Sequence, residues 1–218
     1  MTVPFITLEG IEGSGKSTAL GSLCTALEQA GKAFLRSREP GASELGRSLR
    51  TLLLDAKSQV LPEAELFLYL ADRAQHVGQI IRPALEQGLI VLSDRYADST
   101  IVYQGYGRGL DVERLYALNQ DAVKGLWPDL SILYDLPAQT GLQRARQRNE
   151  ADGTTQSEGR FEAEALAFHQ RIRQGYLDWA ARFPGRFRII DASAPAPEVA
   201  RQTILLVMNH LQQIKGEH

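Results

Sequence analysis

Short apolar runs alternate with longer stretches of helical periodicity from one end of the chain to the other. This alternation predicts an α/β fold built on a parallel sheet. Several of the runs are apolar at consecutive residues, as strands buried on both faces tend to be. The predicted strands cover residues 5–8, 33–37, 89–93, 130–136 and 187–190.

The first helix is predicted after residue 16, where apolar residues recur at i, i+3, i+4 and i+7: Leu20, Leu23, Cys24 and Leu27. Gly31 stands where that helix would end. Cys24 lies on the apolar face, so we interpret it as a core residue.

Prolines and caps mark further helices. Pro62 is placed to open a long helix, and Pro83 falls inside the same pattern, which predicts a kink or two separate helices. Asp111 is the predicted N-cap of a helix that ends near Gly125. Pro137 is placed as the first residue of the next helix.

Residues 149–159 (NEADGTTQSEG) are polar and contain almost no apolar anchor, which predicts a mobile loop. A helix is expected to follow the loop, then the last strand and a closing helix. The apolar residues of that helix are Phe161, Leu166, Phe168, Tyr176 and Trp179, and those of the closing helix are Ile204, Leu205, Met208 and Leu211.

Length and charge limit the class of protein. The 218 residues, 44% of them hydrophobic, predict one folded domain spanning 1–218. A net charge of −2 argues against binding of a nucleic acid polymer. No apolar run is long enough to cross a membrane. Cys24 is the one cysteine and cannot form an internal disulfide, which favours a cytoplasmic location.

The sequence GIEGSGKS at 10–17 satisfies the pattern G-x-x-x-x-G-K-[ST] between a predicted strand and a predicted helix. Glycines let the backbone N–H groups turn inward, and the helix N-terminus adds its positive dipole end. This motif predicts an ATP phosphate site made of Gly10, Ile11, Glu12, Gly13, Ser14, Gly15, Lys16, Ser17 and Thr18. Lys16 would reach the β- and γ-phosphates.

Charged residues follow two other predicted strands and should share the rim of the sheet with this loop. Glu39 follows one strand, and Asp94 and Arg95 follow another. Asp94 and the hydroxyl of Ser17 are suited to hold Mg²⁺ or its waters. The guanidinium of Arg95 can bind a phosphate through two oxygens.

Arginine outnumbers lysine 19 to 5, and three arginines flank the predicted loop. Arg144 and Arg148 lie i, i+4 on a face that leads into it, and Arg160 stands at its far end. A loop that moves arginines over a phosphate site suits phosphoryl transfer. We therefore expect residues 149–160 to form a lid.

Tyr69 and Arg73 are also i, i+4 on one helical face. They pair a ring that can stack with a group that can hydrogen-bond a base edge. This is the outline of a nucleobase pocket, although the same spacing is also common at the edge of a core.

The order of the phosphate loop, REPG, LGRSLRTLLLD, SDRY, DSTIVYQGYGRGL and GRFE resembles that of the bacterial thymidylate kinases over nearly the whole chain. The resemblance implies a P-loop kinase fold, a five-stranded parallel sheet flanked by helices with a short mobile lid. It also implies transfer of the γ-phosphate of ATP to dTMP, giving dTDP and ADP, in dTTP synthesis by a homodimer.

Site residues follow from the motifs that match. Arg50 and Arg95 match the arginines on the dTMP phosphate, and Tyr69 matches the aromatic residue stacked on thymine. Arg73 and Gln104 match the residues on the base edge, with Thr100 beside the base. Glu12 matches the acidic residue near the 3′-hydroxyl, and Asp191 and Ala192 resemble the adenine-side loop, with Arg144 also on the ATP side. The resemblance also implies that position 13, a glycine here, leaves the basic catalytic group to the lid, where Arg160 and then Arg148 are the candidates.

Two alternatives stay open. A deoxynucleoside kinase would need a general base for its hydroxyl acceptor, and Glu39 could serve, whereas Arg50 and Arg95 favour a monophosphate. A P-loop nucleotide switch would show no dependence on an acceptor. The absence of an N-K-x-D motif and the presence of base-pocket residues disfavour a switch.

Overall fold

A computed structural model describes residues 3–216, so the ends of the predicted 1–218 domain lie outside the described residues. The sheet has five parallel strands in the order β2-β3-β1-β4-β5. Its strands are β1 (Phe5–Glu9), β2 (Phe34–Arg38), β3 (Ile90–Asp94), β4 (Leu130–Asp135) and β5 (Phe187–Asp191). All five predicted strands are confirmed, and none of their ends is displaced by more than one residue.

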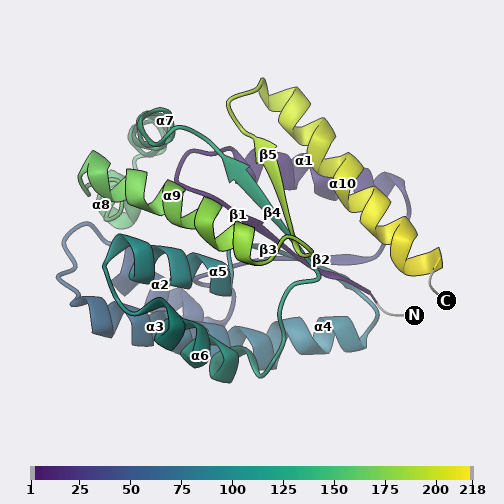
Figure 1. Ribbon diagram of the computed structural model, residues 1–218, viewed down its shortest axis with the longest axis horizontal. Helices are drawn as coiled ribbons and strands as arrows, with labels where there is room; N and C mark the ends of the chain where they lie inside the picture. Colours follow the sequence, from purple (N-terminus) through teal and green to yellow (C-terminus); the bar gives the residue numbers. More distant parts are fainter. Residues whose placement is uncertain (1–2, 217–218) are drawn as a thin grey trace.

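Helices lie on both sides of the sheet, with α1 and α10 on the upper side in Figure 1 and α3, α4 and α6 below it. α1 (Lys16–Gln29) buries its predicted apolar face, Cys24 included. Gly31 follows its end with a φ of +63°, as the pattern predicted. α10 (Ala196–Gly216) packs on α1.

Pro62 opens α3 (Pro62–His76), as predicted. The helical path then continues as a π-helical stretch, Val77–Ile81, and as α4 (Arg82–Glu86), so Pro83 stands in the first turn of a separate helix. Asp111 is the N-cap of α6 (Val112–Val123), because its side chain accepts a hydrogen bond from the Arg114 N–H at 2.7 Å.

The prediction for residues 149–159 is corrected in part. α7 (Ala138–Ala151) begins one residue after Pro137 and runs into this segment, which then forms the short helix α8 (Thr155–Glu158). The following helix, α9 (Leu166–Arg182), starts later than predicted and leaves Phe161 in the connection. The segment therefore has regular structure, because its backbone docks on α2 (Glu44–Leu54) through bonds such as Arg160 N–H to Leu54 C=O.

The remaining elements are α5 (Ala97–Thr100) and a second π-helical stretch, Ile101–Gly107, which packs against α9. π-Helical turns occur frequently at functional sites. No helix in residues 3–216 combines the length and the apolar character that crossing a membrane requires.

Candidate active site

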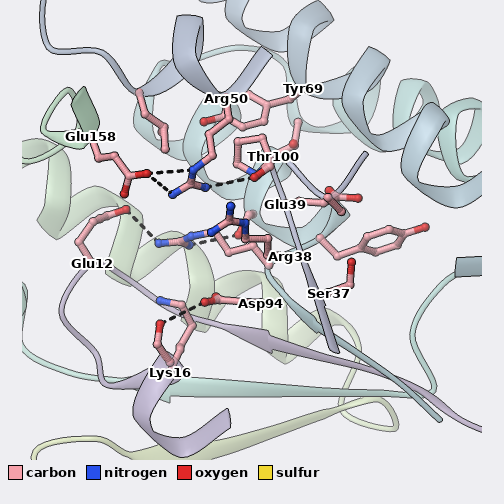
Figure 2. A pocket seen from close by; sticks show the side chains of 18 of the residues that line it. Glu12, Lys16, Ser37, Arg38, Glu39, Arg50, Tyr69, Asp94, Thr100 and Glu158 are labelled. Atoms are coloured by element: carbon pink, nitrogen blue, oxygen red, sulfur yellow. Dashed lines mark hydrogen bonds and ion pairs between the residues drawn. The ribbon is translucent and has the colours of Figure 1, made fainter. Parts of the chain in front are cut away.

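A cavity of about 860 Å³ opens at the carboxyl ends of β1, β2 and β3. The strand register places Leu8, Arg38 and Asp94 at one level, so the segments after these strands meet at one rim. Figure 2 shows Lys16 and Asp94 on one side of the cavity and Arg50, Tyr69 and Thr100 on the other. The cavity thus brings the phosphate loop and the predicted base pocket together.

The phosphate loop needs glycine at the position that the sequence analysis singled out. Gly13 has a φ of +69°, and a Cβ there would lie 2.1 Å from the carbonyl oxygen of Gly141 in α7. A Cβ on Gly141 would in turn lie 2.6 Å from the carbonyl oxygen of Glu12. The two glycines therefore let the loop lie directly on α7 and leave no room for an arginine at position 13.

Lys16 is buried in the loop. Its Nζ donates to the carbonyl oxygens of Gly10 and Ile11, both at 2.9 Å, and to Ser14 Oγ at 3.2 Å. Burial and the nearby Arg95 lower the pKa of Lys16 to about 8, against the opposing effect of Asp94. A triphosphate would offer this ammonium charged acceptors in place of neutral ones.

Ser17 and Asp94 lie together at the cavity, with the Ser17 hydroxyl donating to Asp94 Oδ2 at 3.3 Å. Among the described residues no group of His, Cys, Asp and Glu forms a complete metal cage. Two oxygen donors beside a phosphate loop suit Mg²⁺, which usually keeps several waters and binds through one or two protein oxygens and the substrate phosphates.

Arg95 sits just after β3 with a φ of +68°, a conformation that costs energy for a residue with a side chain. Its guanidinium donates to Gly10 C=O at 2.8 Å, Glu12 Oε1 at 2.9 Å and the Tyr103 hydroxyl at 3.0 Å. Burial alone would raise the pKa of Glu12, but Arg95 and hydrogen bonds from His169 and Tyr103 lower it to about 2. The network holds Arg95 against the phosphate loop.

The residues of the predicted base pocket all line the cavity: Tyr69, Arg73, Thr100 and Gln104. Arg73 is buried, and its five N–H donors all have protein acceptors. These acceptors are Glu39 Oε2 (from both Nε and Nη2), the Tyr96 carbonyl, Thr100 Oγ1 and Asn119 Oδ1. A base edge would therefore have to share one of these donors.

Glu39 is buried at the end of β2 and holds Arg73 at 2.6 Å and His76 Nδ1 at 2.8 Å. Burial raises its pKa, but the charge of Arg73 and a hydrogen bond from His76 outweigh that effect, so the pKa is lowered. A carboxylate paired in this way is a weak base. This geometry disfavours the deoxynucleoside kinase alternative, which assigned the role of base to Glu39.

Arg50, predicted on the acceptor phosphate, contacts the segment that was predicted to form a lid. Its Nε and Nη2 donate to Glu158 Oε1 at 3.1 and 3.0 Å, and its Nη1 donates to the Pro40 carbonyl at 3.1 Å (Figure 2). The Glu158 carboxylate, from the end of α8, thus holds the guanidinium face on which a phosphate could bind.

The two candidate lid arginines occupy different places. Arg148 lines the cavity and is 52% exposed, with Nη2 at 3.5 Å from Glu162 Oε1. Arg160, the first of the two candidates predicted from the sequence, is buried and is not among the residues that line the main cavity. It donates to the Leu53 carbonyl and to Glu65, because two buried acceptors lie there.

A second, smaller cavity of about 280 Å³ lies on the other side of the loop. It is lined by residues that include Gly15, Thr18, Arg144 and Ala192, and Arg144 donates to the Ala192 carbonyl at 3.3 Å. Asp191, predicted to lie on the adenine side, does not line this cavity. Its carboxylate accepts from the Ser193 N–H at 2.9 Å and shapes the turn.

Several residues of the site escaped the sequence analysis. Arg47 adds positive charge to the lining of the main cavity, and Tyr103 and Glu158 accept hydrogen bonds from Arg95 and Arg50, the two arginines predicted on the acceptor phosphate. Glu65 is buried behind Gln104. Tyr103 stands beside Gln104 in a motif that the sequence analysis used, so it could have been predicted as a site residue. Glu65 lies on an amphipathic helix outside any motif, and nothing in the sequence marks it as a site residue.

The parallel sheet, with a phosphate loop between β1 and α1, is the architecture of a P-loop nucleotide-binding protein. The sequence model of the thymidylate kinase family, described as "Thymidylate kinase", matches residues 8–204. The chain is 62% identical to a thymidylate kinase of Nitratidesulfovibrio vulgaris (strain DSM 19637 / Miyazaki F) over 208 residues, covering 95% of this chain and 97% of that one. It is 61% identical to one of Oleidesulfovibrio alaskensis, covering 91% and 94%, and 49% identical to one of Trichlorobacter lovleyi, covering 95% and 98%. The chain belongs to the thymidylate kinase family.

Proposed function

We propose that this protein transfers the γ-phosphate of ATP to dTMP, giving dTDP and ADP for dTTP synthesis. The observation that carries the proposal is the pair of arginines, Arg50 and Arg95, that line one cavity with the phosphate loop and Tyr69. Two guanidiniums provide an acceptor subsite for a phosphate dianion, which a nucleoside acceptor would leave without a partner.

The proposed chemistry needs no general base. The second pKa of a phosphate monoester is about 6, so the attacking oxygen of dTMP is largely ionised at neutral pH. Catalysis then consists of holding two polyanions in line and neutralising the charge between them. Lys16 and Arg95 flank the phosphates in this scheme, and Arg148 supplies charge from the lid.

Mg²⁺ is the proposed metal, held by Ser17 and Asp94 together with the ATP phosphates. When bound, it would neutralise charge on the β- and γ-phosphates. The adenosine of ATP is assigned to the second cavity, between Arg144 and Ala192, because that cavity lies directly beside the phosphate loop.

The base pocket is assigned to thymine, with Tyr69 stacked on the ring, Gln104 and Thr100 at its edge, and Arg73 behind them. Glu12 is assigned to the 3′-hydroxyl side of the sugar. Its ion pair with Arg95 supports this assignment, because it holds the carboxylate next to the arginine proposed for the dTMP phosphate.

We also propose one kinase domain with a lid at residues 149–160 and a homodimer in the cytoplasm. α2 and α3 pack together, and each exposes a large apolar side chain, Leu52 at 53% and Phe67 at 54%. Such exposure on adjacent helices favours an interface between subunits. Sedimentation equilibrium of the wild type and of Leu52→Glu tests the dimer.

The function is tested by measuring ADP release from ATP and Mg²⁺ with dTMP, dUMP, dCMP, dGMP and thymidine in turn. We expect dTMP to stimulate turnover most. Stimulation by thymidine and not by dTMP would replace the proposal with the deoxynucleoside kinase alternative.

A further inference from the structure

Gln104 presents one half of its amide to the protein and the other half to the cavity. The residue lies in the π-helical stretch and is buried. Its Nε2 donates to Glu65 Oε1 at 2.8 Å. Its Oε1 has no hydrogen-bond partner within the described chain, although Gln104 lines the main cavity. A buried acceptor is thus left over at the predicted base pocket, where a ligand can satisfy it.

The orientation of this amide is imposed by Glu65. Glu65 is fully buried on α3, one helical turn before Tyr69. Its carboxylate also accepts hydrogen bonds from Nε and Nη2 of Arg108, each at 3.3 Å, and from the guanidinium of Arg160. A carboxylate held by two guanidiniums only accepts hydrogen bonds. The NH₂ end of Gln104 must therefore face Glu65, and its oxygen cannot.

We propose that Glu65 is a specificity-determining positioning residue, which locks the Gln104 amide with its acceptor toward the base and so selects a pyrimidine that carries an N3–H. The inference rests on the proposed function. Thymine and uracil carry a donor at N3, whereas cytosine carries an acceptor at that atom. Against the locked amide, cytosine would place two acceptors face to face, which costs affinity because neither is satisfied.

The same carboxylate also connects the base pocket to the lid. Arg160 ends the lid segment and donates to Glu65, while Gln104 donates to the other oxygen of Glu65. The Gln104 amide and Arg160 of the lid segment therefore both depend on the buried Glu65 carboxylate. This gives Arg160 a role in positioning, distinct from the transition-state role that the sequence analysis assigned to it.

The test is Glu65→Gln, assayed with dTMP, dUMP and dCMP. A glutamine at 65 can face Gln104 with either end of its amide, so the lock is lost. We expect the ratio of kcat/KM for dTMP over dCMP to fall by about tenfold, the size of one mispaired hydrogen bond. The dTMP over dUMP ratio should stay constant, because both bases carry N3–H. A general loss of pocket structure would change both ratios.

Glu164→Gln is the matched control, because Glu164 also pairs with Arg108 but has no bond to Gln104 or Arg160. It should leave the dTMP over dCMP ratio unchanged. If Glu65→Gln does not fold, the double variant with Arg160→Gln removes one charge of each sign and keeps the cluster balanced. The inference is overturned by an unchanged dTMP over dCMP ratio in a folded Glu65 variant, or by an equal change in Glu164→Gln. If the wild type does not turn over dTMP, the proposed function fails first, and the inference fails with it.

Discussion

Arg50 and Glu158 form an ion pair across the main cavity, with Arg50 Nη2 at 3.0 Å from Glu158 Oε1. One partner belongs to α2 and the other to the lid segment. The carboxylate stands where the acceptor phosphate is proposed to bind, so the substrate and the lid compete for one guanidinium.

This competition predicts that Glu158→Gln tightens dTMP binding. The side chains are 22% and 42% exposed, so solvent screens the pair and the gain should be small, about two- to fivefold in Kd. Titration calorimetry with dTMP measures it. Glu150→Gln, an exposed lid carboxylate on α7, is the control and should leave Kd unchanged. Weaker binding by Glu158→Gln would show that Glu158 assists the acceptor.

Gly13→Ala should destabilise the fold and abolish ATP binding. The added Cβ would lie 2.1 Å from the Gly141 carbonyl oxygen in a left-handed conformation, so the loop must move away from α7. Thermal unfolding and ATP titration test both effects. Gly21→Ala is matched to it, because a Cβ there meets no atom within 4 Å. The control should be neutral or slightly stabilising, since alanine favours a helix. Equal Tm values for the two variants would refute the packing argument.

ATP binding should weaken as the pH rises through about 8, the pKa to which burial and Arg95 lower Lys16. Only the charged ammonium binds phosphate strongly, so Kd for ATP should increase by about tenfold from pH 7 to 9. The effect on stability has the opposite sign. Between about 8 and 10.5 the folded chain binds fewer protons than the unfolded chain, so this group makes stability rise with pH. Titration calorimetry across this range tests binding, and Lys16→Met should remove the dependence. A constant Kd in the wild type would contradict the assignment.

The two lid arginines should differ in what their removal changes. Arg148→Ala should lower kcat and leave Tm nearly unchanged, because Arg148 is 52% exposed at the cavity. Arg160→Ala should lower the free energy of unfolding by about 3–5 kcal/mol, because it leaves the buried Glu65 with one guanidinium fewer. Denaturant unfolding and steady-state kinetics on both variants separate the roles. A loss of kcat in Arg160→Ala at wild-type stability would return Arg160 to the phosphates.

The sequence was sufficient for the sheet and the phosphate loop, because both follow from local patterns. Each strand is a short apolar run, and the loop is a contiguous motif. The α8 segment could not be predicted in this way. Its residues carry no apolar periodicity, and its order comes from contacts with a distant part of the chain, such as the bond from the Ala56 N–H, two residues after α2, to the Gln156 carbonyl at 2.9 Å.

The site residues also fall into those that local patterns predict and those that depend on contacts between distant parts of the chain. Gln104 and Tyr69 lie in recognisable motifs, and the structure brings both to one cavity. The orientation of the Gln104 amide depends on Glu65, which lies 39 residues away along the chain. Only the fold brings such a pair together, so a single sequence cannot show which end of an amide faces a ligand.

Phosphoryl transfer from ATP to dTMP is tested by following the γ-phosphate of labelled ATP with Mg²⁺ and dTMP, and identifying the labelled product by chromatography. Lys16→Met is the control and should lower the rate by at least about 100-fold, as expected when a group that stabilises transition-state charge is lost. We expect label in dTDP, formed only when dTMP is present. Label in inorganic phosphate at a rate independent of dTMP would contradict this, as would label in dTMP formed in a parallel reaction in which thymidine replaces dTMP.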